Sequence, residues 1–338
     1  MKLKPSYTLQ FLALLSTISA CSPSIITDSQ SSQSSTTAPT DVYVSGYVNN
    51  GTYNIASYWK NGVKTELSDG NNGSATANSI FVQGSDVYVG GNVGAKAVIW
   101  KNGVEIQLTD GTRQSEVHSI YVNGNDVYAA GYYCQANCAA AIWVNGVRTQ
   151  LMDFTLTSRA LSVFVSGSDV YVAGVYDNGA MRGTVWKNGV KTDVNGTDSN
   201  VSSIFVRGSD VYVGGLTNNG TRYVPALWVN GSRTEFSGSG ENNNQSVFVD
   251  GSDVYSLVTV WNGTHDTAAI YKNGTRTTLG VPTEDTYVYS IAAKSGDAYV
   301  AGIRYNGVME FAAVWKNGVL TNLSDGTTNA RAYSVFVK

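Results

Sequence analysis

The sequence predicts an all-β fold, a seven-bladed β-propeller with four antiparallel strands in each blade. The first observation is a repeat with a period of about 43 residues, which is typical of propellers or helical arrays. The second is that each period consists of short runs of Val, Ile, Tyr, Phe and Thr separated by Gly and Asn, which favours strands. The third is an Asn-Gly pair in every period. Seven copies align on Asp41, Asp86, Asp126, Asp169, Asp210, Asp253 and Asp297.

One period contains four expected strands, shown here for the copy "SIFVRGSDVYVGG" that starts at Ser203. The first strand covers residues 203–206, and an Arg-Gly-Ser-Asp turn leads to the second at 211–215. A variable hairpin leads to the third at 226–228, which ends in a tryptophan. An Asn-Gly turn then leads to the fourth at 233–236. Four antiparallel strands repeated around a ring form a β-propeller.

The Asn-Gly pairs indicate two-residue type I′ hairpins, because both residues tolerate positive φ. They begin at Asn61, Asn102, Asn145, Asn188, Asn230, Asn273 and Asn317, each just after the third strand. Seven such turns predict seven hairpins of third and fourth strands, and therefore seven blades.

The two ends of the repeat region predict how the ring closes. The region begins at Asp41 with a second strand and ends at Ser334–Val337 with a first strand. The C-terminal strand therefore completes the N-terminal blade, which leaves no blade unpaired.

Two repeated features have both a structural and a functional interpretation. The aromatic residues that end the third strands are expected between blades, and the alternative is a set of sugar-stacking platforms. They are Trp59, Trp100, Trp143, Trp186, Trp228, Tyr271 and Trp315. The repeated aspartates are expected to accept backbone N–H groups within their turns. Calcium sites are the alternative, but no acidic cluster surrounds any of them.

The order of Ser-x-Phe-Val, Gly-Ser-Asp, Val-Tyr-Val-x-Gly and a later tryptophan resembles the WD40 repeat, and "VYVGG" also resembles the kelch repeat. The resemblance covers residues 41–338 and implies a scaffold that binds other molecules. It departs from WD40 at Trp228-Val229, where that family carries Asp, and from kelch in its short, regular turns.

The N-terminus predicts export and lipid anchoring. Lys2 and Lys4 precede a short apolar core in residues 1–20, a pattern typical of a signal peptide. Ile18-Ser19-Ala20-Cys21 resembles the bacterial lipobox, which implies cleavage before Cys21 and lipidation of that residue. Residues 21–40 are rich in Ser and Thr and are expected to form a tether, because such a segment buries too little surface to fold. Ser22 is not Asp, which by resemblance to Gram-negative sorting favours the outer membrane.

Charge and cysteine content narrow the partners. Removal of residues 1–20 leaves 20 basic and 25 acidic residues and no basic cluster, which argues against nucleic acid. Cys134 and Cys138 are expected to form a local disulfide, since the protein is exported and the sequence around them has no pattern of metal ligands. No cofactor or metal site is expected, and the propeller is expected to be a monomer.

The expected site lies on one face of the ring. First-to-second and third-to-fourth turns are nearly constant and share one face. The other connections vary, and function usually lies in variable loops on a rigid scaffold. The residues just before each first strand are expected around the channel mouth on that face: Thr76, Asn78, Glu116, His118, Arg159, Asn200, Asn243, Gln245, Tyr287, Tyr289, Arg331 and Tyr333. Trp261 joins them, because it lies in the most divergent repeat, where Leu257 replaces a small residue.

These observations predict a membrane-anchored module that binds an unknown protein, peptide or glycan. A solvated loop rim without a ligand is the alternative interpretation of the same residues. A lectin-like propeller is a second functional possibility. A hydrolase or lyase with Glu116, His118, Arg159 and Arg331 at the channel mouth is a third, although no nucleophile, phosphate-loop or dinucleotide motif occurs.

Overall fold

A computed structural model of the chain describes residues 40–195, 198–236, 241–280 and 283–338, with the backbone alone for residues 241–245. Thr40–Lys338 form one compact unit. The expected signal peptide, Cys21 and almost all of the expected tether lie outside the described residues.

The described chain forms seven antiparallel sheets of four strands, so the predicted fold is confirmed. Listed from the channel outward, the blades are β28 (Ala330–Val337), β1 (Val42–Asn49), β2 (Asn54–Lys60), β3 (Val63–Glu66); β4 (Ala75–Gln83), β5 (Asp86–Val93), β6 (Lys96–Lys101), β7 (Val104–Gln107); β8 (Ser115–Asn123), β9 (Asp126–Cys134), β10 (Cys138–Val144), β11 (Val147–Gln150); β12 (Ser158–Ser166), β13 (Asp169–Asp177), β14 (Met181–Lys187), β15 (Val190–Asp193); β16 (Ser199–Arg207), β17 (Asp210–Asn218), β18 (Tyr223–Val229), β19 (Ser232–Glu235); β20 (Glu241–Asp250), β21 (Asp253–Trp261), β22 (Asp266–Lys272), β23 (Thr275–Leu279); and β24 (Asp285–Lys294), β25 (Asp297–Tyr305), β26 (Glu310–Lys316), β27 (Val319–Asn322).

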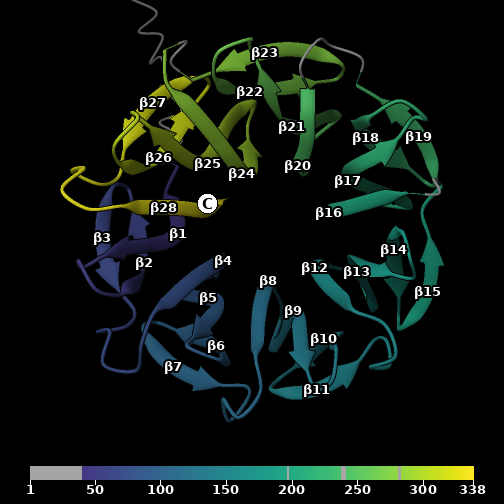
Figure 1. Cartoon of the computed structure of the whole chain (residues 1–338), viewed down its shortest axis with the longest axis horizontal. Helices are drawn as coiled ribbons and strands as arrows, with labels where there is room; N and C mark the ends of the chain where they lie inside the picture. The colour runs from purple at the N-terminus through teal and green to yellow at the C-terminus, as the bar shows by residue number, and fades with distance from the viewer. Residues whose placement is uncertain (1–39, 196–197, 237–240, 281–282) are drawn as a thin grey trace, which may run out of the picture. The chain divides into compact units, whose positions relative to one another are not determined.

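The ring closes through strands from both ends of the repeat region, as predicted (Figure 1). The inner strand β28 pairs antiparallel with β1, from Val42 opposite Val337 to Val48 opposite Ala330. Two backbone hydrogen bonds between Asp41 and Lys338 extend this ladder to the last residue. Each blade therefore has an inner strand: β28, β4, β8, β12, β16, β20 or β24.

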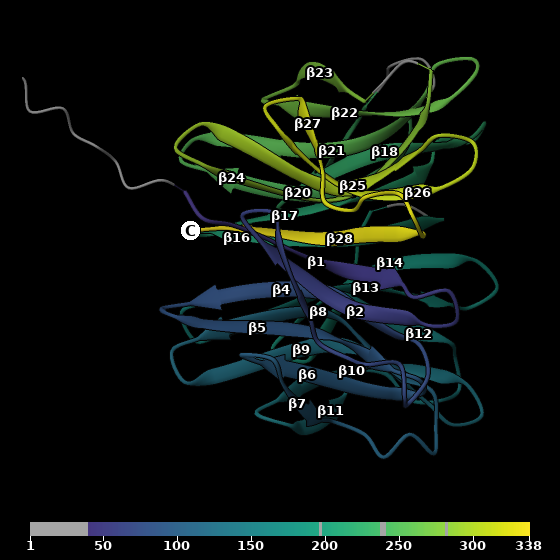
Figure 2. The ribbon, with the colours of Figure 1, turned by 90° about the vertical axis from the view of Figure 1, so that its left-hand side faces the viewer.

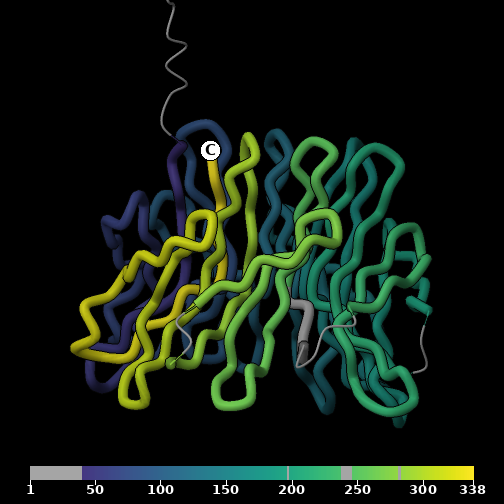
Figure 3. Tube along the Cα trace, turned by 90° about the horizontal axis from the view of Figure 1, so that it is seen from above, coloured from purple at the N-terminus to yellow at the C-terminus, as the bar shows by residue number. Residues whose placement is uncertain are grey.

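The turns divide the molecule into a tight-turn face and a variable face. Asn61 and Gly62 have φ values of 50° and 84°, and the other six Asn-Gly pairs match them, as type I′ turns require. Asp41 and the C-terminus both lie on this tight-turn face (Figures 2 and 3). The opposite, variable face carries second-to-third connections that range from two residues after β5 to four after β17.

The two kinds of tight turn are joined by a side-chain bridge that sequence reasoning did not predict. In every blade the amide of the turn asparagine donates a hydrogen bond to the repeated aspartate, for example from Asn102 Nδ2 to Asp86 Oδ1 at 2.9 Å. The Oδ1 atom of the same asparagine accepts the backbone N–H after the aspartate, as Val87 shows. The aspartates therefore bind the neighbouring turn rather than only their own. The seven bridges are Asp41–Asn61, Asp86–Asn102, Asp126–Asn145, Asp169–Asn188, Asp210–Asn230, Asp253–Asn273 and Asp297–Asn317.

In five blades a lysine at the end of the third strand adds an ion pair to this bridge. Lys101 Nζ lies 3.1 Å from Asp86 Oδ2 and also 5.1 Å from the centre of the Tyr88 ring. Lys60, Lys187, Lys272 and Lys316 repeat both contacts. Val144 and Val229 occupy this position in the other two blades.

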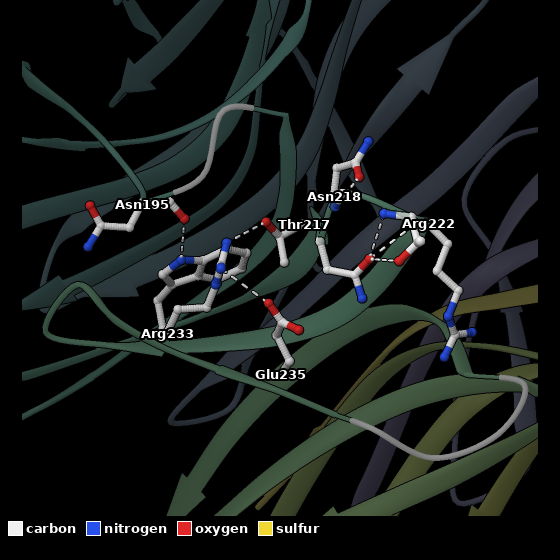
Figure 4. A network of polar contacts seen from close by, with 10 residues as sticks. Asn195, Thr217, Asn218, Arg222, Arg233 and Glu235 are labelled. Atoms are coloured by element: carbon white, nitrogen blue, oxygen red, sulfur yellow. Dashed lines mark hydrogen bonds and ion pairs between the residues drawn. The ribbon is translucent and has the colours of Figure 1, made fainter.

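The aromatic residues that end the third strands are packed in the core, as predicted. Six tryptophans are at most 1% exposed, and Tyr271 is 9% exposed. Each large apolar side chain buried in this way contributes about 1.5–3 kcal/mol. Trp228 also donates its indole N–H to the carbonyl of Asn195 at 3.0 Å, beside an Arg233 side chain that contacts Thr217 and Glu235 (Figure 4).

A circle of serine hydroxyls joins the inner strands of neighbouring blades. The Oγ atom of Ser79 accepts the backbone N–H of Ile120 at 3.1 Å, and the Oγ atom of Ser334 accepts that of Ile80 across the closure. The five other junctions use Ser119, Ser162, Ser203, Ser246 and Ser290. This repetition explains why the serine recurs, because each hydroxyl pairs an N–H group that its own sheet leaves open.

The aspartate bridges predict how stability depends on pH. Hydrogen bonds from asparagine and lysine lower the pKa of Asp41, Asp86, Asp169, Asp253 and Asp297 below the ordinary value of 3.8. A lowered folded-state pKa contributes stability above the unfolded-state value, and this contribution is lost as pH falls through the folded-state value. The free energy of unfolding, measured by denaturant titration, should therefore fall below about pH 4. Asp297→Asn should remove part of this decrease, and an unchanged pH profile in that variant would contradict the assignment.

Candidate functional site

Every inner strand contains a one-residue β-bulge near the variable face. In β4 the pairing with β5 shifts between Ala77 and Ser79, so Asn78 has no partner in the ladder. The same shift isolates one residue in each of the other blades: His118, Leu161, Ser202, Gln245, Tyr289 and Tyr333. A bulge redirects a side chain and often lies beside a functional site. These seven residues are the bulge residues below.

The bulges correct one sequence-based expectation. The candidate residues were expected in loops before the first strands, but they lie within those strands. The inner strand of the fifth repeat begins at Ser199, not at Ser203. Strand pairing thus continues past the bulge toward the variable face, where a polar sequence without regular alternation is typical of a loop.

A glycine on the second strand makes each regular bulge possible. A Cβ atom built on Gly131 would lie 1.8 Å from the backbone oxygen of Glu116, which no side chain can occupy. The same close approach occurs at Gly46, Gly91, Gly174, Gly215 and Gly302. In the blade of β20 to β23 this position is Val258, and there β20 has a second register shift, between Glu241 and Asn243. The divergence of this repeat therefore involves Val258 as well as Leu257.

The bulge residues surround a cavity of about 500 Å³ at the channel. Its lining consists of Thr76, Asn78, Glu116, His118, Leu161, Asn200, Ser202, Tyr289 and Tyr333. A volume in this range is typical of small-molecule sites. The structure thus gathers six of the candidate residues, together with Thr76, around one cavity.

Glu116 is the centre of a hydrogen-bond network on one wall. Its Oε1 accepts a hydrogen bond from Asn78 Nδ2 at 2.7 Å, and its Oε2 accepts one from the Tyr132 hydroxyl at 3.0 Å. Asn78 also donates to the carbonyl oxygen of Val117. Both carboxylate oxygens are therefore held by neutral donors, and the Glu116 side chain is only 23% exposed.

His118 lies beside this network but is not hydrogen-bonded to it. Its Nδ1 is 4.0 Å from Glu116 Oε1, which is beyond hydrogen-bond distance. Burial lowers the pKa of His118, while the nearby Glu116 carboxylate acts in the opposite direction and Arg159 lowers the pKa further. The imidazole is therefore neutral at pH 7. Its Nε2 atom is buried and has no hydrogen-bond partner among the described residues.

Tyrosines form another part of the wall. The rings of Tyr289 and Tyr333 meet edge to face with centroids 5.2 Å apart, and Tyr47 packs behind Tyr333 at 5.9 Å. Burial raises the pKa of Tyr289 to about 12 and raises that of Tyr333. Both phenols are therefore protonated at neutral pH and can donate as well as accept hydrogen bonds.

The other candidate residues do not line the cavity. Arg331 is held by Glu310 through two hydrogen bonds of 2.5 and 2.6 Å, and Arg159 lies 5.3 Å from the centre of the Tyr132 ring. Trp261 lies on a separate hollow of about 380 Å³ beside Val260 and is 46% exposed. Tyr287 lies on β24 outside the lining, and the side chains of Asn243 and Gln245 lie outside the described residues.

Sequence reasoning missed Leu161 and Ser202, which line the cavity. The signal that identifies them is positional. Each bulge residue directly precedes the repeated serine of the first strand, so Leu161 and Ser202 occupy the same repeat position as Asn78 and His118. Selecting candidates by polarity excluded the leucine, although position in the repeat would have included it.

Cys134 and Cys138 face each other across the hairpin of β9 and β10 and are joined by a disulfide. Within the described ranges, no group of three or more His, Cys, Asp or Glu residues is placed to hold a metal ion. In the same part of the chain, no helix is long and apolar enough to cross a membrane.

Comparison with solved structures finds a similar propeller in the crystal structure of TolB from Acinetobacter baumannii. The TM-score is 0.51 at 10% sequence identity, and the match covers 87% of this chain and 66% of the TolB chain. The similarity shows the fold alone. No protein-family model and no curated protein sequence matches the chain, so the resemblance to WD40 and kelch repeats stays a prediction.

Proposed function

We propose that the protein is an exported, lipid-anchored β-propeller that binds a ligand or partner protein at the central cavity of its variable face. The observation that carries this proposal is the contrast within each repeat. The serine, the glycine and the Asp–Asn bridge are repeated, whereas the bulge residues that point into the cavity differ from blade to blade. Repeated residues maintain the ring, and the variable ones give the cavity its specific chemistry.

The position of the N-terminus supports the anchored arrangement. The propeller begins at Asp41 on the tight-turn face, and the cavity residues lie toward the opposite face. An anchor at Cys21 attached through a tether of about 20 residues therefore leaves the cavity open to other molecules of the cell envelope, with the outer membrane as the proposed location.

Binding is favoured over catalysis by the state of the charged residues. A hydrolase or lyase needs an acid or base positioned to exchange a proton with its substrate. Glu116 is held by Asn78 and Tyr132, and Arg331 is held by Glu310. The Glu116–His118 distance of 4.0 Å also leaves the two side chains without a shared proton. We therefore propose a binding role without chemistry.

The anchor is tested by Cys21→Ala. The variant should lose lipid labelling, and the protein should leave the detergent-extracted membrane fraction, because no other part of the sequence is proposed to hold it there. Ser22→Ala serves as the control and should remain lipidated. Membrane association of Cys21→Ala equal to that of the wild type would contradict the anchor.

The site is tested by blocking the cavity. Asn200→Trp should fill space beside Ser202, whereas Val104→Trp adds the same side chain on the outer strand β7, where the valine is 68% exposed. Thermal unfolding would be followed with peptides, glycans and peptidoglycan fragments. A ligand should raise the melting temperature of the wild type and of Val104→Trp but not of Asn200→Trp. Equal shifts in all three proteins, or no shift with any compound, would contradict the proposal.

A further inference from the structure

The chemistry of the cavity lining is unusual in its balance. Of the nine lining residues only Leu161 has an aliphatic side chain, while the others supply two phenols, two amides, two hydroxyls, an imidazole and one carboxylate. His118 is neutral at pH 7, so Glu116 is the one charged residue of this lining. The cavity is therefore polar but contains little charge.

The charges around the cavity are already matched. Each Glu116 oxygen accepts a hydrogen bond, and the Arg159 guanidinium lies nearby over the Tyr132 ring. Glu310 holds Arg331 through both of its carboxylate oxygens. An anionic ligand would approach the Glu116 carboxylate, and a cationic one would compete with Arg159. Both would lose hydration without gaining a free partner, which disfavours charged ligands.

The large and small side chains lie on opposite sides of the cavity. Tyr289 and Tyr333 come from adjacent inner strands, β24 and β28. Figure 1 shows β28 across the channel from β16, which carries Asn200 and Ser202. An aromatic wall thus faces small polar side chains, and the space between them suits a flat ligand with polar edges.

We infer that this cavity binds a neutral saccharide, with the C–H face of a sugar ring against Tyr333 and Tyr289 and its hydroxyl groups at Asn78 and Asn200. Sugars combine an apolar C–H face with a rim of hydroxyl groups, and C–H groups are attracted to the negative face of an aromatic ring. Asn78 donates to Glu116 and to the Val117 carbonyl, so its Oδ1 is directed to a ligand hydroxyl. This inference rests on the proposed binding function and names its ligand class.

The test is isothermal titration calorimetry of the full chain with N-acetylglucosamine, chitobiose, maltose, cellobiose and lactose, and with charged glucosamine and glucuronic acid. At least one neutral sugar should bind, and its charged counterpart should bind about tenfold more weakly. Tyr333→Ala should weaken binding about five- to tenfold through loss of the aromatic contact, whereas Tyr333→Phe should change it less than about twofold.

Two further variants keep the test decisive. Tyr289→Ala removes the second ring in case Tyr333→Ala unfolds the protein, because Tyr333 also packs against Tyr47. Trp261→Ala removes an exposed aromatic outside the cavity and should leave saccharide binding unchanged. Loss of binding in Trp261→Ala but not in the tyrosine variants would overturn the inference by moving the sugar to the rim.

The two levels of the account fail differently. If no neutral saccharide binds but a peptide or charged compound binds in a manner that Asn200→Trp abolishes, the saccharide inference is wrong and the binding function stands. If none of these compounds binds and Asn200→Trp has no effect with any of them, both are wrong.

Discussion

The close approach of two backbones at the bulge of each inner strand is the constraint on which the site depends. At this point a glycine of the second strand lies against a carbonyl of the first, and a Cβ atom would come within about 2 Å of that oxygen. The approach lets the inner strand insert one extra residue and turn that side chain into the channel. The repeated serine that follows the bulge bonds the next blade, so the insertion also sets the junction between blades.

This arrangement separates the residues that hold the ring from those that contact a ligand. The tryptophans, the serine circle and the Asp–Asn bridges are the same in nearly every blade and form the core, the junctions and the tight-turn face. The bulge residue carries none of these contacts to a neighbouring blade. It can therefore be an amide, an imidazole, a leucine or a tyrosine without loss of closure, which is how a repetitive scaffold acquires an asymmetric cavity.

Local patterns explain how much of this was predictable. Strand runs, Asn-Gly turns and the register of the two ends specify blade number and closure, because each depends on residues close in sequence. The Asp86–Asn102 bridge joins residues 16 positions apart and leaves no local signal. The bulge is a one-residue insertion in a polar stretch, so the position of His118 within a strand was missed. Its separation from Glu116 depends on side-chain placement, which repeats do not encode.

The measurement that tests this account most directly is the free energy of unfolding of Gly131→Ala beside Ala130→Gly. The two variants exchange the same atoms at adjacent positions of β9. Gly131→Ala should lose at least about 2 kcal/mol, because the new Cβ meets the Glu116 carbonyl, whereas Ala130→Gly should lose only about 1 kcal/mol. A Gly131→Ala protein as stable as the wild type would show that the bulge does not depend on the glycine and would contradict the account.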